Sequence, residues 1–261
     1  MSEKNEKLVK AWDITAKNYF SEVVSPFAEG VQNPMYWYIE KKIEFSKRKS
    51  VIDIGTGIGN LIPFLSKEFK EVVGVDISPK MIELAKKKTE AFDNIRLLVR
   101  DATNLKEFHN QFDVATAVNS ILLPEVKMIE KMLSEVYSVL NDDGIFVAIF
   151  PSIDAILHRA VLEHEKSIEE GDDEKTALEK TNKAIESDKC DFVRGTFKYH
   201  DMVQKHYYRF ELNYRLRKAG FKNIRLRKVF YPWEVYDDEE MMQFQGKPEL
   251  WDWFVFAEKK I

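Results

Sequence analysis

The stretch VIDIGTGIGN, residues 51–60, combines one carboxylate with three closely spaced glycines. Glycines that follow a hydrophobic strand allow a tight turn, and backbone N–H groups in such a turn can face a charged ligand. A phosphate is one such ligand and an amino acid is another. Asp53, two residues before Gly55, favours the amino acid, because a carboxylate repels a pyrophosphate and attracts an ammonium group.

The spacing of the glycines supports the same choice. Dinucleotide-binding loops have the pattern G-x-G-x-x-G, whereas here the third glycine, Gly59, comes one residue early and Asn60 follows it. A NAD-dependent oxidoreductase is therefore the less favoured alternative. We expect S-adenosylmethionine, whose amino acid end carries an ammonium and a carboxylate group, to contact Asp53, Gly55, Thr56 and Gly57.

Two further carboxylates end hydrophobic runs at places where a bound nucleoside would lie. Asp76 comes 21 residues after Gly55 and is expected to accept hydrogen bonds from both ribose hydroxyls, in either class of cofactor. Asp101 and the backbone N–H of Ala102 are expected at the edge of the adenine ring. Ile77 and Met81 are expected to cover the face of that ring.

Each of these residues also has a purely structural interpretation. Asp53 and Asp76 can cap helices, and Asp101 can form the turn where a strand ends. Ile77 and Met81 can be ordinary core residues. The three glycines can serve a tight turn alone, although their order and spacing with the acidic residues favour a binding site.

These residues need a regular frame to bring them together. Short apolar runs predict strands at 51–55, 71–77, 95–101, 112–118 and 144–150, and helical periodicity predicts helices at 61–69, 79–92 and 125–140. Strands that alternate with helices form a parallel, doubly wound α/β sheet. Two more helices, at 4–22 and 34–45, are expected before the first strand.

The second half of the chain has a different pattern. Residues 155–190 are charged and helical in period, with an interruption at 171–173, which is typical of an inserted cap. A helix at 207–220 and two aromatic-rich strands, at 223–233 and 251–260, follow. We therefore predict a single domain made of N-terminal helices (1–48), a core (49–151), a helical cap insertion (152–206) and a C-terminal helix with a strand pair (207–261).

Taken in order, the motifs resemble those of the class I S-adenosylmethionine-dependent methyltransferases. VIDIGTGIGN resembles the first motif of that family, VVGVDIS its acidic second-strand motif and RDATNL its adenine motif. FDVATAVNSILL and LNDDGIFVAIFP resemble the fourth and fifth strands with their adjoining loops. WDITAKNYF, residues 12–20, is similar to the D-x-x-A-x-x-Y helix that precedes the core in many members that act on small molecules.

The resemblance implies both a fold and a set of contacts. The fold is a mostly parallel seven-stranded sheet in the order 3-2-1-4-5-7-6, with the last strand antiparallel. The cofactor contacts implied for this chain are Tyr19, Asp53, Gly55, Gly57, Asp76, Ile77, Asp101, Ala102 and Asn119.

Composition narrows the class of partner. The 40 basic and 44 acidic residues nearly balance, which argues against nucleic acid as the default partner. Cys190 is the one cysteine, and the five histidines lack the spacing of metal ligands, so we expect no disulfide and no metal site. The first residues lack an apolar signal region and no run is long enough to span a membrane, so we expect a cytoplasmic protein.

The acceptor is less clearly encoded than the cofactor. The loop NSILLPE, residues 119–125, lacks the histidine and the N/D-P-P-Y motif found there in other members of the family. We expect a small organic acceptor, methylated on O, N or C, with His200, His206 and Tyr207 as candidate bases or orienting groups. The basic run 215–228 supports an alternative hypothesis, a methyltransferase that acts on RNA or protein.

Overall fold

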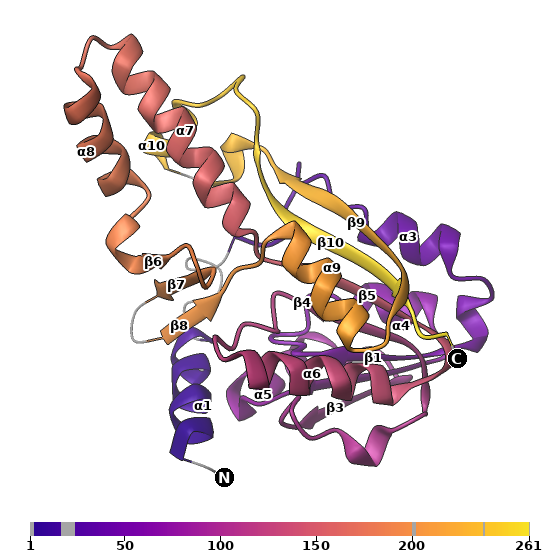
Figure 1. Cartoon of the computed structure of the whole chain (residues 1–261). Helices are drawn as coiled ribbons and strands as arrows, with labels where there is room; N and C mark the ends of the chain where they lie inside the picture. The colour runs from indigo at the N-terminus through magenta and orange to yellow at the C-terminus, as the bar shows by residue number, and fades with distance from the viewer. Residues whose placement is uncertain (1–2, 17–23, 200–201, 237, 261) are drawn as a thin grey trace.

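A seven-stranded sheet forms the body of the protein (Figure 1). The computed structural model describes residues 3–16, 24–199, 202–236 and 238–260. The sheet has the order β3-β2-β1-β4-β5-β10-β9, and β10 runs antiparallel to both of its neighbours, so the predicted order and the predicted antiparallel last strand are confirmed. The strands are β1 (Ser50–Ile54), β2 (Glu71–Asp76), β3 (Ile95–Val99), β4 (Phe112–Val118), β5 (Leu140–Phe150), β9 (Lys222–Tyr231) and β10 (Leu250–Glu258).

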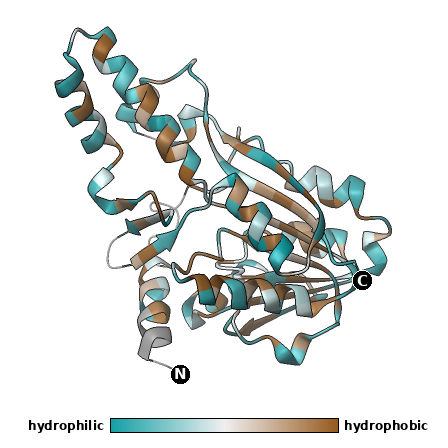
Figure 2. Cartoon of the chain, in the orientation of Figure 1, coloured by the Kyte–Doolittle hydropathy of each residue, from teal (hydrophilic) through white to brown (hydrophobic). Residues whose placement is uncertain are grey.

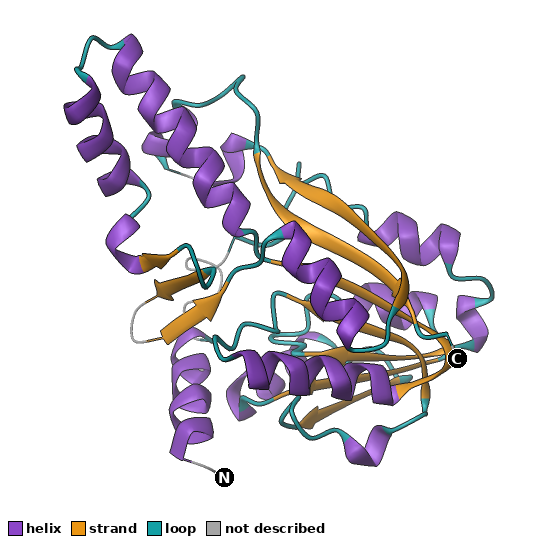
Figure 3. Ribbon diagram, viewed as in Figure 1, coloured by secondary structure: helices purple, strands orange, loops and turns teal. Residues whose placement is uncertain are grey.

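Helices cover both faces of this sheet (Figure 3). One face packs against α6 (Val126–Val139) and α9 (Arg209–Lys218). The other packs against α3 (Met35–Lys42), α4 (Ile62–Glu68) and α5 (Pro79–Lys88). The central strands are therefore buried on both sides, which explains why they read as continuous apolar runs and why the apolar residues gather on the strands in Figure 2.

The cap combines helices with a small sheet. Helices α7 (Ile153–Glu169) and α8 (Glu174–Ala184) form a hairpin that projects from the body in Figure 1. The expected interruption lies between them, where Gly171 has a φ of +97° and the Asp173 side chain caps α8 through the Thr176 N–H. The cap is not helical throughout: β6 (Cys190–Asp191), β7 (Thr196–Tyr199) and β8 (Met202–Lys205) form a three-stranded antiparallel sheet.

The small sheet has no alternating burial pattern. Thr196 and Lys205, which face each other across β7 and β8, are buried, whereas Val203, on the same face of β8 as Lys205, is exposed. The period of two that predicts a strand from sequence is therefore missing here.

The N-terminal helix α1 (Glu3–Thr15) lies against α5. Asp13 accepts hydrogen bonds from the Ser78 hydroxyl and, at 3.3 Å, from the Lys80 N–H. Ala16 joins Ile58 and Met81 in a buried cluster between the helix and the glycine loop. Asp13 and Ala16, two residues of the motif at 12–20, therefore secure α1 beside the loop, whereas Tyr19 lies outside the described residues.

Candidate cofactor and acceptor site

The glycine loop lies between β1 and α4, at the carboxyl edge of the sheet. Gly55 and Gly57 have φ values of +71° and +55°, which glycine adopts more readily than any other residue. A Cβ added to Gly55 would lie 2.2 Å from the Cβ of Ser120, so this glycine allows the loop after β4 to pack directly on the glycine loop. A Cβ added to Gly57 would meet nothing within 4 Å, so open space lies over this residue.

The N–H groups of this loop are used differently from our expectation. The Gly55 and Thr56 N–H groups donate to the Val75 carbonyl at 2.8 and 2.9 Å. The Gly57 N–H donates to Oδ2 of Asp76 at 2.9 Å. Because β1 and β2 are parallel neighbours that end at the same level, the end of β2 satisfies these donors, and they hold the loop in shape instead of facing a ligand.

Asp76 is partly exposed at the end of β2 and next to the open space over Gly57. Its Oδ1 accepts the Ser78 N–H at 2.9 Å, while Oδ2 accepts the Gly57 N–H. Burial raises the pKa of this carboxyl, and the N–H groups of Ser78, Gly57 and Ile77 oppose that rise. Each carboxylate oxygen retains a lone pair, so the group can still accept a bond from a diol such as a ribose.

Asp53 lies deeper, beneath the loop, and only 3% of its surface is exposed. The Thr116 hydroxyl donates to its Oδ1 at 2.7 Å. Burial raises the pKa of this carboxyl to about 6, although the hydroxyls of Thr56 and Thr116 oppose the shift and the charge of Asp76 adds to it. A poorly solvated carboxylate of this kind is stabilised by a nearby cation, so the donor set fits a ligand with an ammonium group.

The residues expected around the adenine ring lie on the neighbouring elements. Asp101 accepts hydrogen bonds from the N–H and the hydroxyl of Thr103, both at 2.8 Å, as a turn former after β3 does. Ala102 and Ile77 are half-buried, and Met81 is buried in the cluster with Ala16 and Ile58. These contacts agree with the structural interpretation, and the contact with adenine remains a prediction.

Asn119 follows β4 and has a φ of +45°, a left-handed conformation that asparagine tolerates better than most residues. Its side-chain NH₂ group donates to Oδ2 of Asp252 on β10 at 3.0 Å. Tyr231, at the end of β9, donates to the same oxygen at 2.7 Å, and the Ser152 N–H donates to Oδ1 at 3.3 Å. Asp252 thus joins the ends of β4, β5, β9 and β10.

Sequence reasoning missed Asp252, although one signal was present. It is the lone acidic residue in the apolar run LWDWFVFA, residues 250–257. A carboxylate within an apolar strand is shielded from water, and such a carboxylate has hydrogen-bond partners.

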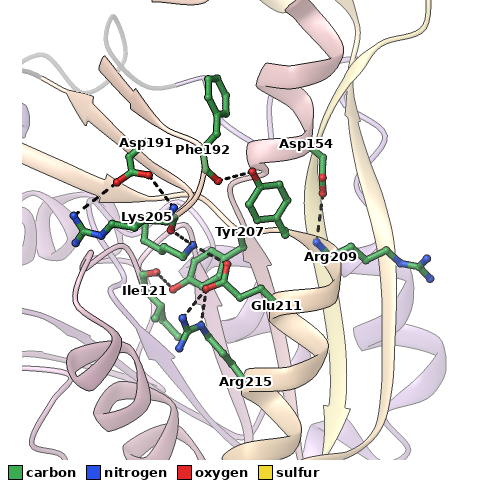
Figure 4. Close-up of polar contacts among 11 residues, drawn as sticks. Ile121, Asp154, Asp191, Phe192, Lys205, Tyr207, Arg209, Glu211 and Arg215 are labelled. Carbon is green, nitrogen blue, oxygen red and sulfur yellow. Dashed lines mark hydrogen bonds and ion pairs between the residues drawn. The ribbon is translucent and has the colours of Figure 1, made fainter. Parts of the chain in front are cut away.

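The three candidate bases or orienting groups have different surroundings, and Figure 4 shows those of Tyr207. Tyr207 is fully buried, its hydroxyl donates to the Ile121 carbonyl at 2.7 Å, and burial raises its pKa far above the usual range. This placement gives Tyr207 a structural contact, and its role as a base or orienting group stays a prediction. His200 lies outside the described residues.

His206 occupies a different environment on the same segment. Its backbone N–H donates to the Gly195 carbonyl at 2.8 Å, and its ring is largely buried, with Nδ1 lacking a hydrogen-bond partner among the described residues. Burial and the charge of Lys205 lower its pKa to about 4, while contact with the Ser152 backbone opposes that change. The imidazole is therefore neutral at neutral pH.

A buried ion pair holds this part of the cap against the body. Nζ of Lys205 donates to the Arg194 carbonyl at 2.6 Å and to Glu211 on α9 at 2.7 Å, and Glu211 also pairs with Arg215 (Figure 4). The backbone continues the attachment, because the Lys205 N–H donates to the Leu122 carbonyl at 2.8 Å. Residues 205–207 are thus secured beside the loop that follows β4.

Neither a metal centre nor a membrane span emerges from the part of the chain that the structure describes. No group of three or more His, Cys, Asp or Glu side chains there is arranged to hold a metal ion. In addition, none of the helices among those residues is long and apolar enough to cross a membrane.

Comparison with known proteins identifies the core. Residues 51–144 match the family model described as a methyltransferase domain. A Geobacillus sp. protein provisionally named a methyltransferase is 32% identical over 116 residues, 42% of this chain and 47% of that protein. The demethylmenaquinone methyltransferase of Thermus thermophilus is 35% identical over 107 residues, 40% of this chain and 48% of the relative. The chain therefore spans about half the length of these relatives.

The fold is similar to that of a solved methyltransferase structure. A solved Thermotoga maritima structure, described as an S-adenosylmethionine-dependent methyltransferase and possible histamine N-methyltransferase, superimposes with a TM-score of 0.57 at 19% identity. The superposition covers 95% of this chain and 98% of that one. Residues 51–144 thus match a methyltransferase domain, and the chain shares its fold with a solved protein described as an S-adenosylmethionine-dependent methyltransferase.

Proposed function

We propose that the protein transfers the methyl group of S-adenosylmethionine to a small organic acceptor, at an O, N or C nucleophile. The observation that carries this proposal is the order of groups along the carboxyl edge of the sheet. Asp76 and the open space over Gly57 lie at the ends of β2 and β1, and Asp252 with its partners lies across the ends of β4 and β5. A cofactor at β1 and β2 therefore directs its reactive end toward β4 and β5, under the cap.

The proposed contacts divide the cofactor among the residues of this edge. Asp76 binds the ribose, Asp53 and the loop around Gly55, Thr56 and Gly57 bind the amino acid end, and the residues near Asp101 bind the adenine. Bound in this way, S-adenosylmethionine supplies an electrophilic methyl group on a positively charged sulfur. The carboxylates of Asp53, which is buried, and Asp252, which is half-buried, lie on either side of that position in the strand order, and they stabilise positive charge there.

Alignment and exclusion of water account for most of the expected rate. Holding a nucleophile in line with the methyl group contributes on the order of 7–11 kcal/mol to lowering the barrier. The cap segment 205–207, secured by Lys205 and Tyr207, covers the loop after β4 and shields the reacting atoms from water.

The distribution of basic residues favours a small acceptor over RNA. Within 215–228, Arg215 and Lys218 pair with Glu211 and Glu130, and Lys228 lies 3.2 Å from the centre of a Trp251 ring. These cations are neutralised or placed over aromatic rings, whereas a binding groove for a phosphate backbone needs them free and aligned. The Thermus relative is named for methylation of demethylmenaquinone, which is a small molecule.

Calorimetry with S-adenosylhomocysteine tests the proposal. The wild-type protein should bind this product, and Asp76→Asn should weaken binding by about 10- to 100-fold, because a hydrogen bond to a charged group contributes about 1.5–3 kcal/mol. Asp113→Asn is the matched control. Asp113 accepts the Ser50 N–H at 2.9 Å at the opposite end of β4, so its substitution loses the same kind of bond away from the site.

The same instrument distinguishes the rival cofactor. NADH should give no heat of binding under conditions in which S-adenosylhomocysteine binds. Tight NADH binding, or an affinity for S-adenosylhomocysteine that Asp76→Asn leaves unchanged, would overturn the proposed function.

A further inference from the structure

The carboxylate of Asp252 reaches the acceptor side of the site because β10 runs antiparallel. Its neighbour Trp253 is paired with Phe150, the last residue of β5, so Asp252 lies level with the carboxyl ends of the parallel strands. The Asp252 residue is half-buried, and it forms no ion pair with a lysine or arginine in the described parts of the chain. Three neutral donors, from Asn119, Tyr231 and Ser152, surround it instead.

This carboxylate determines which way the Asn119 amide faces. An ionised carboxylate can only accept hydrogen bonds, so the NH₂ end of the amide must point toward Asp252. Oδ1 of Asn119 therefore points away from it. That oxygen is buried and has no hydrogen-bond partner among the residues that the structure describes, an arrangement that costs free energy until a donor arrives.

The orphaned oxygen lies where the acceptor has to approach. Ser120, the next residue, packs on Gly55 and donates to the Ile54 carbonyl at 2.6 Å, so Asn119 adjoins the glycine loop. Asp76 and the ribose position lie beyond the other side of that loop, on β2. His206, whose Nδ1 also lacks a partner among the described residues, contacts the backbone of Ser152 next to Asp252.

We propose that Asp252 is a positioning residue for the methyl acceptor, and that it holds Asn119 so that Oδ1 accepts a hydrogen bond from the acceptor's own N–H or O–H group. The inference rests on the proposed function and names its substrate class, an amine or a hydroxyl compound. The hydrogen bond orients the nucleophile so that its lone pair faces the methyl carbon. A bond forms from N or O to that carbon, the carbon–sulfur bond breaks with its electron pair left on sulfur, and the N–H or O–H proton is released to water.

Sinefungin tests this inference without knowledge of the acceptor. In sinefungin, a carbon that bears a primary amine replaces the methyl-bearing sulfur, so an N–H donor occupies the methyl position. The wild-type protein should bind sinefungin about tenfold more tightly than S-adenosylhomocysteine, because only sinefungin supplies a charged donor to Oδ1 of Asn119. The measured quantity is the ratio of the two dissociation constants from calorimetry.

Two variants and one control make the test specific. Asp252→Asn frees the amide of Asn119 to turn, and Asn119→Gly removes it while tolerating the positive φ, so both should bring the ratio close to one. Asp113→Asn is the control, because Asp113 also accepts a backbone N–H and lies 3.5 Å from an asparagine NH₂ group, that of Asn141, but at the far edge of the sheet. Its ratio should equal that of the wild type.

The outcomes are distinguishable. A wild-type ratio close to one, or a ratio that survives in Asn119→Gly, overturns the role of Asp252 and Asn119 while the proposed function stands. Failure of the wild type to bind S-adenosylhomocysteine at all overturns the proposed function and this inference with it. Thermal unfolding of Asp252→Asn identifies a loss of folding, and in that case the ratio for Asn119→Gly decides.

Discussion

The two halves of the carboxyl edge are built in different ways. On the cofactor side, the contacts of the acidic residues at the ends of β2 and β3 are short in sequence: Asp76 bonds to residues 2 and 19 positions away, and Asp101 bonds to Thr103. On the acceptor side, Asn119 and Asp252 are 133 positions apart, and Ser152 and Asp252 are 100 apart. The proposed ribose and adenine contacts therefore depend mainly on local motifs, whereas the proposed acceptor contacts depend on the assembled fold.

The largest expected effect comes from the glycine at which the two halves touch. Gly55→Ala places a Cβ at a φ of +71° and 2.2 Å from Ser120, so we expect it to abolish cofactor binding and to lower the free energy of unfolding by roughly 3 kcal/mol. Urea unfolding and calorimetry measure both. Gly171→Ala, at a positive φ with no neighbour within 4 Å, should cost only about 1 kcal/mol and leave binding intact.

A pH titration should separate the two halves next. The pKa of Asp53 is raised from its usual value to about 6, and an ammonium group favours the ionised form. Binding of S-adenosylhomocysteine should therefore be fully present above pH 6 and weaken about tenfold for each pH unit below it. Burial also raises the pKa of Asp76, so Asp53→Asn is needed to isolate the effect: it should bind more weakly at pH 8 and lose most of the dependence near pH 6. A wild-type affinity that is constant from pH 8 to 5 would contradict this prediction.

Tyr207→Phe tests whether the cap segment acts through structure alone. The substitution leaves the Ile121 carbonyl without its donor, so the free energy of unfolding should fall by about 1–3 kcal/mol in urea titrations. The pH dependence of methyl transfer should not change, because the hydroxyl has no free position from which to take a proton. A shift of the acidic or alkaline limb of the pH–rate profile in Tyr207→Phe would instead show that Tyr207 acts as a base.

The smallest effect is expected outside both halves. Lys218→Gln breaks an exposed ion pair with Glu130, which contributes about 0–1 kcal/mol. Affinity for S-adenosylhomocysteine and the rate with a small acceptor should both be unchanged at any salt concentration. A strong, salt-dependent loss of turnover would favour the hypothesis of an RNA acceptor.

The sequence predicted the parts of this molecule whose signals are local. The alternation of strands and helices and the placement of Asp53 and Asp76 near strand ends followed from apolar periodicity and motif spacing, whereas the strand order and the antiparallel last strand followed from the resemblance of the motifs to a known family. The sequence did not predict that the N–H groups of the glycine loop donate to Val75 and Asp76. These bonds depend on the register of β1 and β2, which sets the level at which each strand ends. The sequence did not predict the polar cluster around Asp252 for a related reason, because its partners at the ends of β4, β5 and β9 meet only after the strands are paired.

The small sheet of the cap shows a second limit. Lys205 lies in a segment rich in charged residues, and that composition predicts that its side chain is exposed. Its side chain is buried instead, because the backbone carbonyl of Arg194 and the carboxylate of Glu211 make burial favourable. A count of charged residues cannot identify these partners. They come together only when α9 packs beside the segment.

The position of β10 has a consequence for how the protein is made. Because β10 pairs with β5 on one side and β9 on the other, the last strand of the chain has to enter the interior of the sheet. During synthesis, β1 to β3 and the glycine loop leave the ribosome long before Asp252 does. The nascent chain thus gains the proposed cofactor site first, and it completes the polar cluster around Asp252 only when β10 has been made.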